Sequence, residues 1–150
     1  MNWADAYLAQ AKSDLAVYEH LGNQPYPACH RLHYLQMWLE KLCKSLMLPE
    51  ELTLLQYKHG VVAKVLPRQI QQRLGRTPSN MRDLRRLCRE IDLLHPQVDD
   101  DGRTPANVEY PFLQSGSISV PADWNFDVSR ALYTSHGRTL LSIAKQISSG

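Results

Sequence analysis

The sequence lacks several features that would assign it to a familiar class of protein. It has no run of about 18 apolar residues, the length of a membrane-spanning helix, so we expect no membrane span. Residues 1–5 have neither the basic nor the apolar region of a signal peptide. The motifs of dinucleotide-binding proteins, P-loop enzymes, serine hydrolases and zinc proteases are all missing. We therefore expect a cytoplasmic protein that carries no cofactor.

Cysteine is scarce as well, and Cys29, Cys43 and Cys88 do not have the spacing of metal ligands. An odd number of cysteines, two of them near apolar helix positions, indicates reduced thiols rather than a disulfide framework. Cys29 and His33 lie one helical turn apart, but two ligands alone do not make a metal site. We therefore expect no bound metal.

The remaining composition is that of one folded domain. At 150 residues, with 43% hydrophobic and 21% charged residues, the chain can bury a core without disulfides, so we expect residues 1–150 to form a single domain. Apolar residues at helical spacing predict an all-α fold. Specifically, we expect an up-and-down bundle of four to five helices with a long irregular loop before the last helix.

The most regular stretch, residues 28–48, predicts the central helix of this bundle. Its leucines recur at steps of three and four and form one apolar stripe: Leu32, Leu35, Leu39, Leu42 and Leu46. Gln36, Glu40 and Lys44 follow one another at steps of four and form a polar line along the same helix. The simplest interpretation is a core helix with a solvated polar edge, which implies no function.

Prolines and capping residues predict where the neighbouring helices begin and end. Residues 2–21 should form a first helix, followed by a short proline-containing link, so that the first two helices make an antiparallel hairpin. Pro49 should close the second helix. Pro67 cannot sit inside a helix without a break, so a new helix is predicted from Arg68 to Leu74.

The second half of the chain divides into a helix, a loop and a last helix. Thr77-Pro78 should start the next helix, with the threonine as its cap. Residues 96–124 lose periodicity and should form the irregular loop, in which Tyr110, Phe112 and Trp124 reach the core and residues 118–120 make a short strand. The acidic run at residues 99–102 is not a calcium loop, because its twelfth position is Val108. The last helix should start at Asn125 or Asp127.

Positive charge is concentrated in residues 57–91, where only Asp83 and Glu90 oppose it. Because the whole chain has a formal charge of only +2, this segregation predicts a basic face. Arginines at steps of three and four stack on one side of a helix, and guanidinium groups so placed suit phosphates. The alternative is a solvated face neutralised by acidic residues elsewhere in the fold. The candidate phosphate-binding residues are Lys64, Arg68, Arg82, Arg85 and Arg86.

The order Gln36, Glu40, Lys41, Lys44 on a leucine-rich second helix resembles the HEPN domain family of small prokaryotic helical bundles. The resemblance extends over about residues 3–147. Three other short segments of the chain follow one another in the same order as their counterparts in the family, namely Asp14-Leu15, Lys58-His59 and Glu109-Tyr110-Pro111. At the last of these the chain has a glutamate where many members have an arginine.

The resemblance implies particular chemistry, because many HEPN domains are metal-independent ribonucleases with an arginine placed four to six residues before a histidine. Cleavage of RNA needs a cation beside the phosphate and a group of near-neutral pKa to move the 2′-hydroxyl proton. Arg89 with His95, and Arg130 with His136, both fit this spacing. On a continuous helix such a pair diverges, whereas His95 precedes a proline that ends the helix, so Arg89 and His95 are the favoured catalytic candidates.

Three functions therefore remain open. The first is a HEPN-like module that binds nucleotide or RNA phosphates through the arginine face and acts with a partner protein, as nucleotidyltransferase-associated members imply. The second is a metal-independent endoribonuclease of toxin or defence type that uses Arg89 and His95. The third is a scaffold whose basic face meets an acidic protein. Many HEPN domains dimerise, and the wide apolar edge of residues 28–48 would permit a homodimer.

Overall fold

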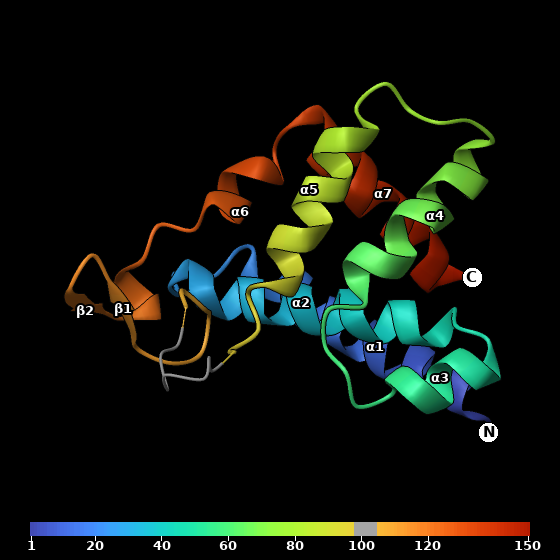
Figure 1. Ribbon diagram of the computed structural model, residues 1–150, viewed down its shortest axis with the longest axis horizontal. Coiled ribbons are helices and arrows are strands. Elements are labelled where there is room, and N and C mark those ends of the chain that lie inside the picture. Colours follow the sequence, from blue (N-terminus) through green and yellow to red (C-terminus); the bar gives the residue numbers. More distant parts are fainter. Residues whose placement is uncertain (98–104) are drawn as a thin grey trace.

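The computed structural model describes residues 1–97 and 105–150, which are predominantly helical, as expected (Figure 1). The α-helices, in chain order, are α1 (Trp3–Leu21), α2 (Ala28–Ser45), α3 (Pro49–Leu55), α4 (Val62–Leu74), α5 (Met81–Asp92), α6 (Asp127–Ala131) and α7 (Ser135–Ser149). Between α5 and α6 lie the strands β1 (Phe112–Gln114) and β2 (Ser117–Ser119) and the 3₁₀ helix η1 (Pro121–Asp123). None of the helices in this described part combines the length and hydrophobicity needed to span a bilayer.

The predicted hairpin of the first two helices is present, and α1 and α2 run side by side (Figure 1). Asn2 caps α1 by accepting a hydrogen bond from the Asp5 backbone N–H at 2.9 Å. Near the other end, the Tyr18 ring packs on Trp38 with centroids 5.6 Å apart. The α4–α5 pair and α7 cover α2, so this helix has neighbours on several sides. The leucine stripe is accordingly buried, except for a half-buried Leu46.

Two predictions based on proline were wrong. Pro49 does not end α2, which stops at Ser45, but occupies the first turn of α3, where a missing N–H costs nothing. Pro67 lies inside α4 and does not break it. The buried side chains around it, Val65, Leu66 and Ile70, face the core. Their burial outweighs the cost of about 3 kcal/mol that an interior proline imposes on a helix.

One predicted helix start was displaced, and one predicted helix is interrupted. Helix α5 begins at Met81 rather than at Thr77-Pro78, and the Thr77 hydroxyl instead accepts a hydrogen bond from Gln71 at 2.7 Å. The helix predicted from Asn125 or Asp127 does begin at Asp127, but it ends at Ala131 as α6. Thr134 caps a separate helix, α7, and its side chain accepts a hydrogen bond from the Gly137 N–H at 3.2 Å. The apolar residues of α5 form its buried face: Met81, Leu84, Leu87, Cys88 and Ile91.

The predicted loop contains more structure than expected. Residues 98–104, which include the whole acidic run at 99–102, lie outside the described residues. Beyond them, Phe112 is buried and meets Trp124 edge to face at 5.2 Å. Tyr110, expected to reach the core, is exposed. The segment is held instead by Asn107, whose side chain accepts the Tyr110 N–H at 2.7 Å and donates to its carbonyl at 3.2 Å.

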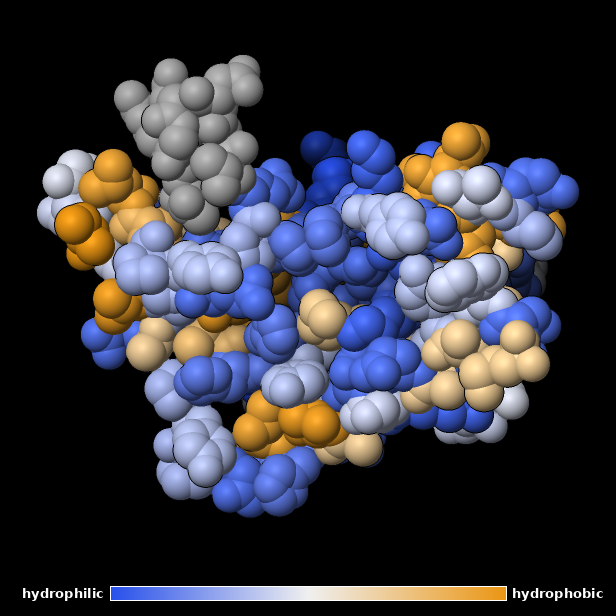
Figure 2. Space-filling view, turned by 90° about the horizontal axis from the view of Figure 1, so that it is seen from below, coloured by the Kyte–Doolittle hydropathy of each residue, from blue (hydrophilic) through white to orange (hydrophobic). Residues whose placement is uncertain are grey.

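The surface is uneven in polarity. Seen from below, hydrophobic residues gather near the β1–β2 end and near the α3 end, and a further hydrophobic patch lies at the lower centre of the view, within mostly hydrophilic surface (Figure 2). The exposed apolar side chains at these two ends include Leu113, Ile118, Leu48 and Leu54.

Candidate functional site

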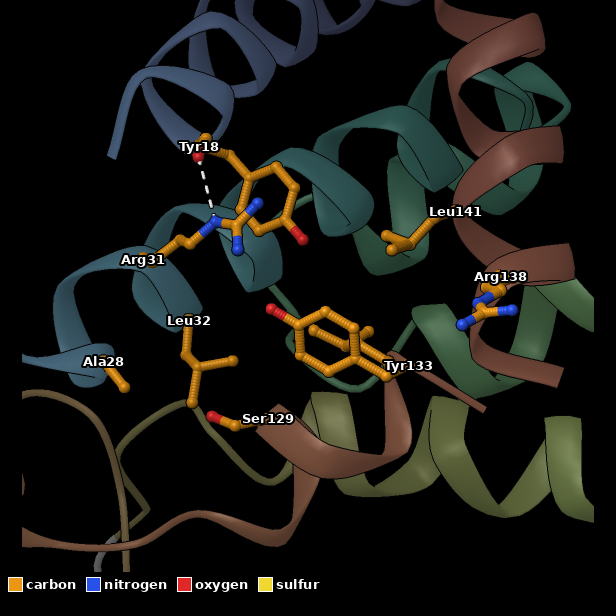
Figure 3. A pocket seen from close by; sticks show the side chains of 9 residues that line it. Tyr18, Ala28, Arg31, Leu32, Ser129, Tyr133, Arg138 and Leu141 are labelled. Carbon is orange, nitrogen blue, oxygen red and sulfur yellow. Dashed lines mark hydrogen bonds between the residues drawn. The ribbon is translucent and has the colours of Figure 1, made fainter. Parts of the chain in front are cut away.

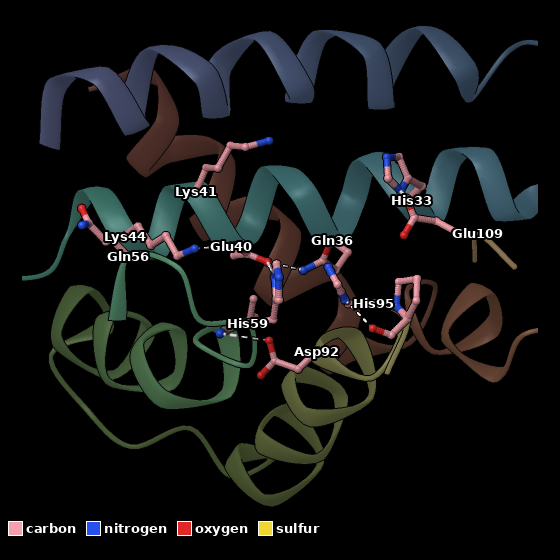
Figure 4. A network of polar contacts seen from close by, with 12 residues as sticks. His33, Gln36, Glu40, Lys41, Lys44, Gln56, His59, Asp92, His95 and Glu109 are labelled. Atoms are coloured by element: carbon pink, nitrogen blue, oxygen red, sulfur yellow. Dashed lines mark hydrogen bonds and ion pairs between the residues drawn. The ribbon is translucent and has the colours of Figure 1, made fainter. Parts of the chain in front are cut away.

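The polar line of α2 is not solvated but forms the centre of a buried network. Glu40 is 5% exposed, and three neighbours donate hydrogen bonds to its carboxylate (Figure 4). Gln36 Nε2 and Lys44 Nζ donate at 2.7 Å, and His59 Nδ1 lies 2.9 Å from Oε2. Gln36 is 1% and Lys44 is 3% exposed. The predicted solvated edge was therefore wrong, since His59 and the segment that follows α3 cover it.

Burial and hydrogen bonding act in opposite directions on the Glu40 carboxyl. Burial by itself raises its pKa, but the hydrogen bonds from His59, Lys44 and Gln36 together outweigh burial and lower the pKa below its usual value. Glu40 therefore carries a buried negative charge, which Lys44 balances from one helical turn away. Charges that are buried and fully hydrogen-bonded hold their neighbours in one geometry.

His59 leads from this network to the end of α5, where its ring stacks on His95 (Figure 4). The ring centroids are 3.5 Å apart and the planes are inclined by 26°. His95 Nδ1 donates a hydrogen bond to the Pro96 carbonyl oxygen at 2.8 Å. In each ring the Nδ1 atom is thus engaged, and Nε2 makes no hydrogen bond to the residues that the structure describes. Both histidines therefore present a nitrogen that can accept or donate a proton.

Asp92, at the last position of α5, is buried beside this histidine pair. Its two carboxyl oxygens accept the backbone N–H groups of Val62 and Ala63 at 3.1 and 2.9 Å, so that α5 caps the start of α4. Burial, more than any other cause, raises the pKa of Asp92 to about 6. The sequence interpretation missed this residue, although its position four residues after the buried Cys88 places it beside the apolar stripe of α5.

Two further contacts join residues that carried the family resemblance. Lys41 Nζ lies 2.6 Å from Asp14 Oδ2, so this pair ties α2 to α1. His33 Nδ1 lies 3.6 Å from a carboxyl oxygen of Glu109 (Figure 4). Burial lowers the pKa of His33, against the opposing effect of Glu109. Glu109 thus has a partner on α2.

The predicted basic side chains on α4 and α5 are all exposed: Lys64, Arg68, Arg82, Arg85, Arg86 and Arg89. We call these six residues the arginine face. Arg86 Nε donates to Glu90 Oε1 at 3.1 Å within the same helix. Within residues 1–97 and 105–150, no carboxylate lies within ion-pair distance of the other five.

The favoured catalytic pair is not joined by a direct contact. Arg89 is exposed on the last full turn of α5, whereas His95 is half-buried on His59, and no hydrogen bond links the two within the described residues. The alternative pair was set aside on a premise that was wrong, because Arg130 and His136 lie on opposite sides of the α6–α7 break. Both line a pocket of about 260 Å³, in which Arg130 pairs with Asp127.

No known protein-family model, curated protein sequence or solved structure matches this chain. In the described part of the chain, no cluster of three or more histidine, cysteine or carboxylate side chains is arranged to hold a metal ion.

Proposed function

We propose that the protein is a HEPN-like module, an up-and-down helical bundle, that binds the phosphates of a nucleotide or RNA through the arginine face. One observation carries this proposal. Of the six basic side chains on that face, only Arg86 has a carboxylate partner among the described residues. A solvated face that the fold neutralises would pair most of them. Unpaired guanidinium groups instead remain available to an external anion.

The spacing on α5 supports the same proposal. Arg82, Arg85 and Arg89 recur at steps of three and four, so one side of the helix carries a line of planar hydrogen-bond donors. Helix α4 packs directly against α5 and adds Lys64 and Arg68, which are one helical turn apart. Neither helix carries an exposed aromatic ring, so binding would rest on phosphates rather than on base stacking. We therefore expect the protein to bind RNA with little preference for its nucleotide sequence.

The proposal predicts a steep dependence of binding on salt. A fluorescently labelled, mixed-sequence single-stranded RNA is titrated with the protein at several salt concentrations, and affinity is measured by anisotropy. The triple variant Arg82→Gln/Arg85→Gln/Arg89→Gln should reduce the slope of log affinity against log salt by about 2, since each single-strand phosphate contact contributes about 0.7. Lys12→Gln, which removes one exposed charge from α1, is the matched control. Equal affinity and slope in the triple variant and the wild type would refute the arginine face as the site.

Association with a nucleotidyltransferase-like partner protein is a further part of the proposal, and it rests only on the resemblance. The alternative of a scaffold for an acidic protein makes the opposite prediction for RNA. A protein surface that recognises one acidic partner should prefer that partner over an arbitrary polyanion of similar charge.

A second candidate function, metal-independent RNA cleavage, is favoured by the state of His95. Its Nδ1 is fixed by the Pro96 carbonyl, its ring is fixed by His59, and its Nε2 makes no bond within the described residues. An oriented imidazole with one available nitrogen is what a general acid or base requires. Arg89 would supply the positive charge from the preceding turn of α5.

The test is cleavage of a labelled mixed RNA in EDTA by the wild type and by Arg89→Ala and His95→Ala, each checked for folding by circular dichroism. Cleavage that disappears in both folded variants would support this pair. Cleavage that persists in both would exclude it and would direct attention to Arg130 and His136. Intact RNA under conditions where the wild type binds it would favour the binding module.

A further inference from the structure

A pocket lined by none of the candidate site residues lies between α1, α2 and the α6–α7 corner (Figure 3). Its volume is about 360 Å³, within the range of small-molecule sites. Nine residues line it, and none of them is acidic: Tyr18, Ala28, Arg31, Leu32, Ser129, Leu132, Tyr133, Arg138 and Leu141. The pocket therefore combines an apolar floor with two positive charges.

One of these charges is held in place by two contacts with Tyr18, and Gly22 leaves space beside it. The Arg31 guanidinium lies over the Tyr18 ring, 4.3 Å from its centroid, and Arg31 Nε donates to the Tyr18 carbonyl at 3.2 Å. A Cβ atom at Gly22 would lie 2.8 Å from Arg31 Nη2, so a larger residue there would push the end of the Arg31 side chain aside. Gly22 has φ −59°, a conformation open to any residue, which leaves the close approach of Arg31 as the reason for a glycine here.

The other side chains at the pocket are placed to receive a ligand. Arg138, on α7, is exposed and has no carboxylate within ion-pair distance among the residues that the structure describes. Tyr133 is 70% exposed, and its hydroxyl and that of Tyr18 extend toward the space between the two rings (Figure 3). Glu19, the nearby carboxylate on α1, pairs with Lys145 at 3.3 Å instead of with either arginine. Burial raises the pKa of Tyr18, which keeps its hydroxyl protonated and able to donate.

We propose that this pocket binds a small organic anion of about mononucleotide size, independently of the arginine face. Arg31 and Arg138 supply the charge for its acidic group, and the leucines and the Tyr133 ring receive its flat apolar body. The absence of lining carboxylates excludes a cationic ligand, because it would meet two unbalanced guanidinium groups. The apolar floor makes free phosphate a poor ligand, because most of the pocket would then stay unfilled.

The test is a titration of the ¹⁵N-labelled protein with adenosine monophosphate, adenosine and inorganic phosphate, followed by amide chemical shifts. Adenosine monophosphate should shift the amides of residues 129–141 and bind about tenfold more tightly than either fragment. Arg138→Gln should weaken binding about tenfold, and Gly22→Ala should also weaken it by displacing Arg31 while retaining its charge. Lys12→Gln should bind as the wild type does. Both pocket variants change exposed positions, and circular dichroism establishes that they fold.

Three results would overturn the inference. Adenosine that binds as tightly as its monophosphate would show that the arginines do not recognise an anion. Shifts confined to residues 82–89 would place the ligand on the arginine face, which supports the proposed function but not this pocket. A titration without shifts would refute the pocket, while the separate RNA-binding measurement would still decide the arginine face.

Discussion

Lys44 Nζ lies 2.7 Å from Glu40 Oε1, one turn apart on α2, and both side chains are almost fully excluded from solvent. Removing two charges from water costs several kcal/mol per ion, and their attraction repays that cost only when the geometry is good and the remaining polar atoms are satisfied. Here Gln36 and His59 satisfy the second carboxyl oxygen. The pair thus fixes the position of His59, and through it the stacked His95.

Breaking this buried pair should be strongly destabilising. Glu40→Gln leaves the Lys44 ammonium without its counterion, and Lys44→Met leaves the Glu40 carboxylate without its counterion. Either change should therefore lower the free energy of unfolding by about 3–5 kcal/mol. The double variant should lose less than the sum of the two. Urea unfolding measures all three changes.

The exposed Arg86–Glu90 pair has the same spacing and provides the matched control. Because its arginine is 74% exposed, Glu90→Gln should change stability by less than about 0.5 kcal/mol. If Glu40→Gln and Lys44→Met also changed stability by less than about 0.5 kcal/mol, the conclusion that Glu40 and Lys44 form a buried, paired network would be contradicted.

The raised pKa of Asp92 predicts a pH dependence of stability with a definite sign. The carboxyl has a pKa of about 6 in the folded protein and 3.8 as the ordinary value, so the folded state binds this proton more tightly. Its contribution to the free energy of unfolding is fully present below pH 3.8 and is lost as the pH rises through about 6. Asp92→Asn removes the titration while keeping one oxygen to accept a backbone N–H.

The measurement is urea unfolding of the wild type and of Asp92→Asn at about pH 4 and about pH 7.5. At each pH, the free energy of unfolding of Asp92→Asn is subtracted from that of the wild type. This difference should be about 2 kcal/mol larger at the lower pH than at the higher one. Comparing the two proteins cancels the other groups that titrate in this range, including Glu40, whose lowered pKa acts in the opposite sense. A difference that stays constant with pH would show that Asp92 has an ordinary pKa.

The sequence predicted the helical class and the α1–α2 hairpin because the apolar spacing of α2 is regular and Asn2 is a strong cap. The prediction at Pro67 failed because the burial of Val65 and Ile70 outweighs the cost of about 3 kcal/mol that an interior proline imposes on a helix. The sequence did not predict the α6–α7 break, because neither Thr134 nor Gly137 alone indicates a new helix. The helix starts there because the Thr134 side chain accepts a hydrogen bond from the Gly137 N–H. Local signals thus predicted the elements better than their boundaries.

The candidate site was predictable only in part. Periodicity placed Gln36, Glu40 and Lys44 on one line but could not say that His59, from a later loop, would cover it. The stacking of His59 on His95 joins residues far apart in the chain, and no spacing rule relates them. The arginine face was predicted more fully, because exposure of charge on an amphipathic helix follows directly from its sequence.

The three cysteines should be unreactive in the folded protein. All are buried and free, as predicted for reduced thiols. Burial raises the pKa of Cys88 to about 12 and raises that of Cys43 well above its ordinary value, and only the thiolate reacts with a disulfide reagent. Ellman's reagent at about pH 8 should therefore label none of them promptly in the native state and all of them in denaturant. A thiol that reacts at once in the native protein would contradict its burial.

Gly137 should be essential for the packing of α7 against the end of α6. A Cβ atom there would lie 2.6 Å from Leu132 Cα and even closer to the Ala131 carbonyl oxygen. Both are backbone atoms, so no side-chain rotation can relieve the overlap. Gly137→Ala should therefore lower the free energy of unfolding by about 1–3 kcal/mol, although alanine is the better helix former.

Ser142→Ala, at an exposed position on the same helix, separates this steric effect from helix propensity. It should change stability by less than about 0.5 kcal/mol, in the stabilising direction. Because Leu132 and Tyr133 also line the proposed anion pocket, a displaced α6–α7 corner should weaken binding of adenosine monophosphate as well. Unchanged stability of Gly137→Ala in urea would mean that α7 does not approach the end of α6 this closely.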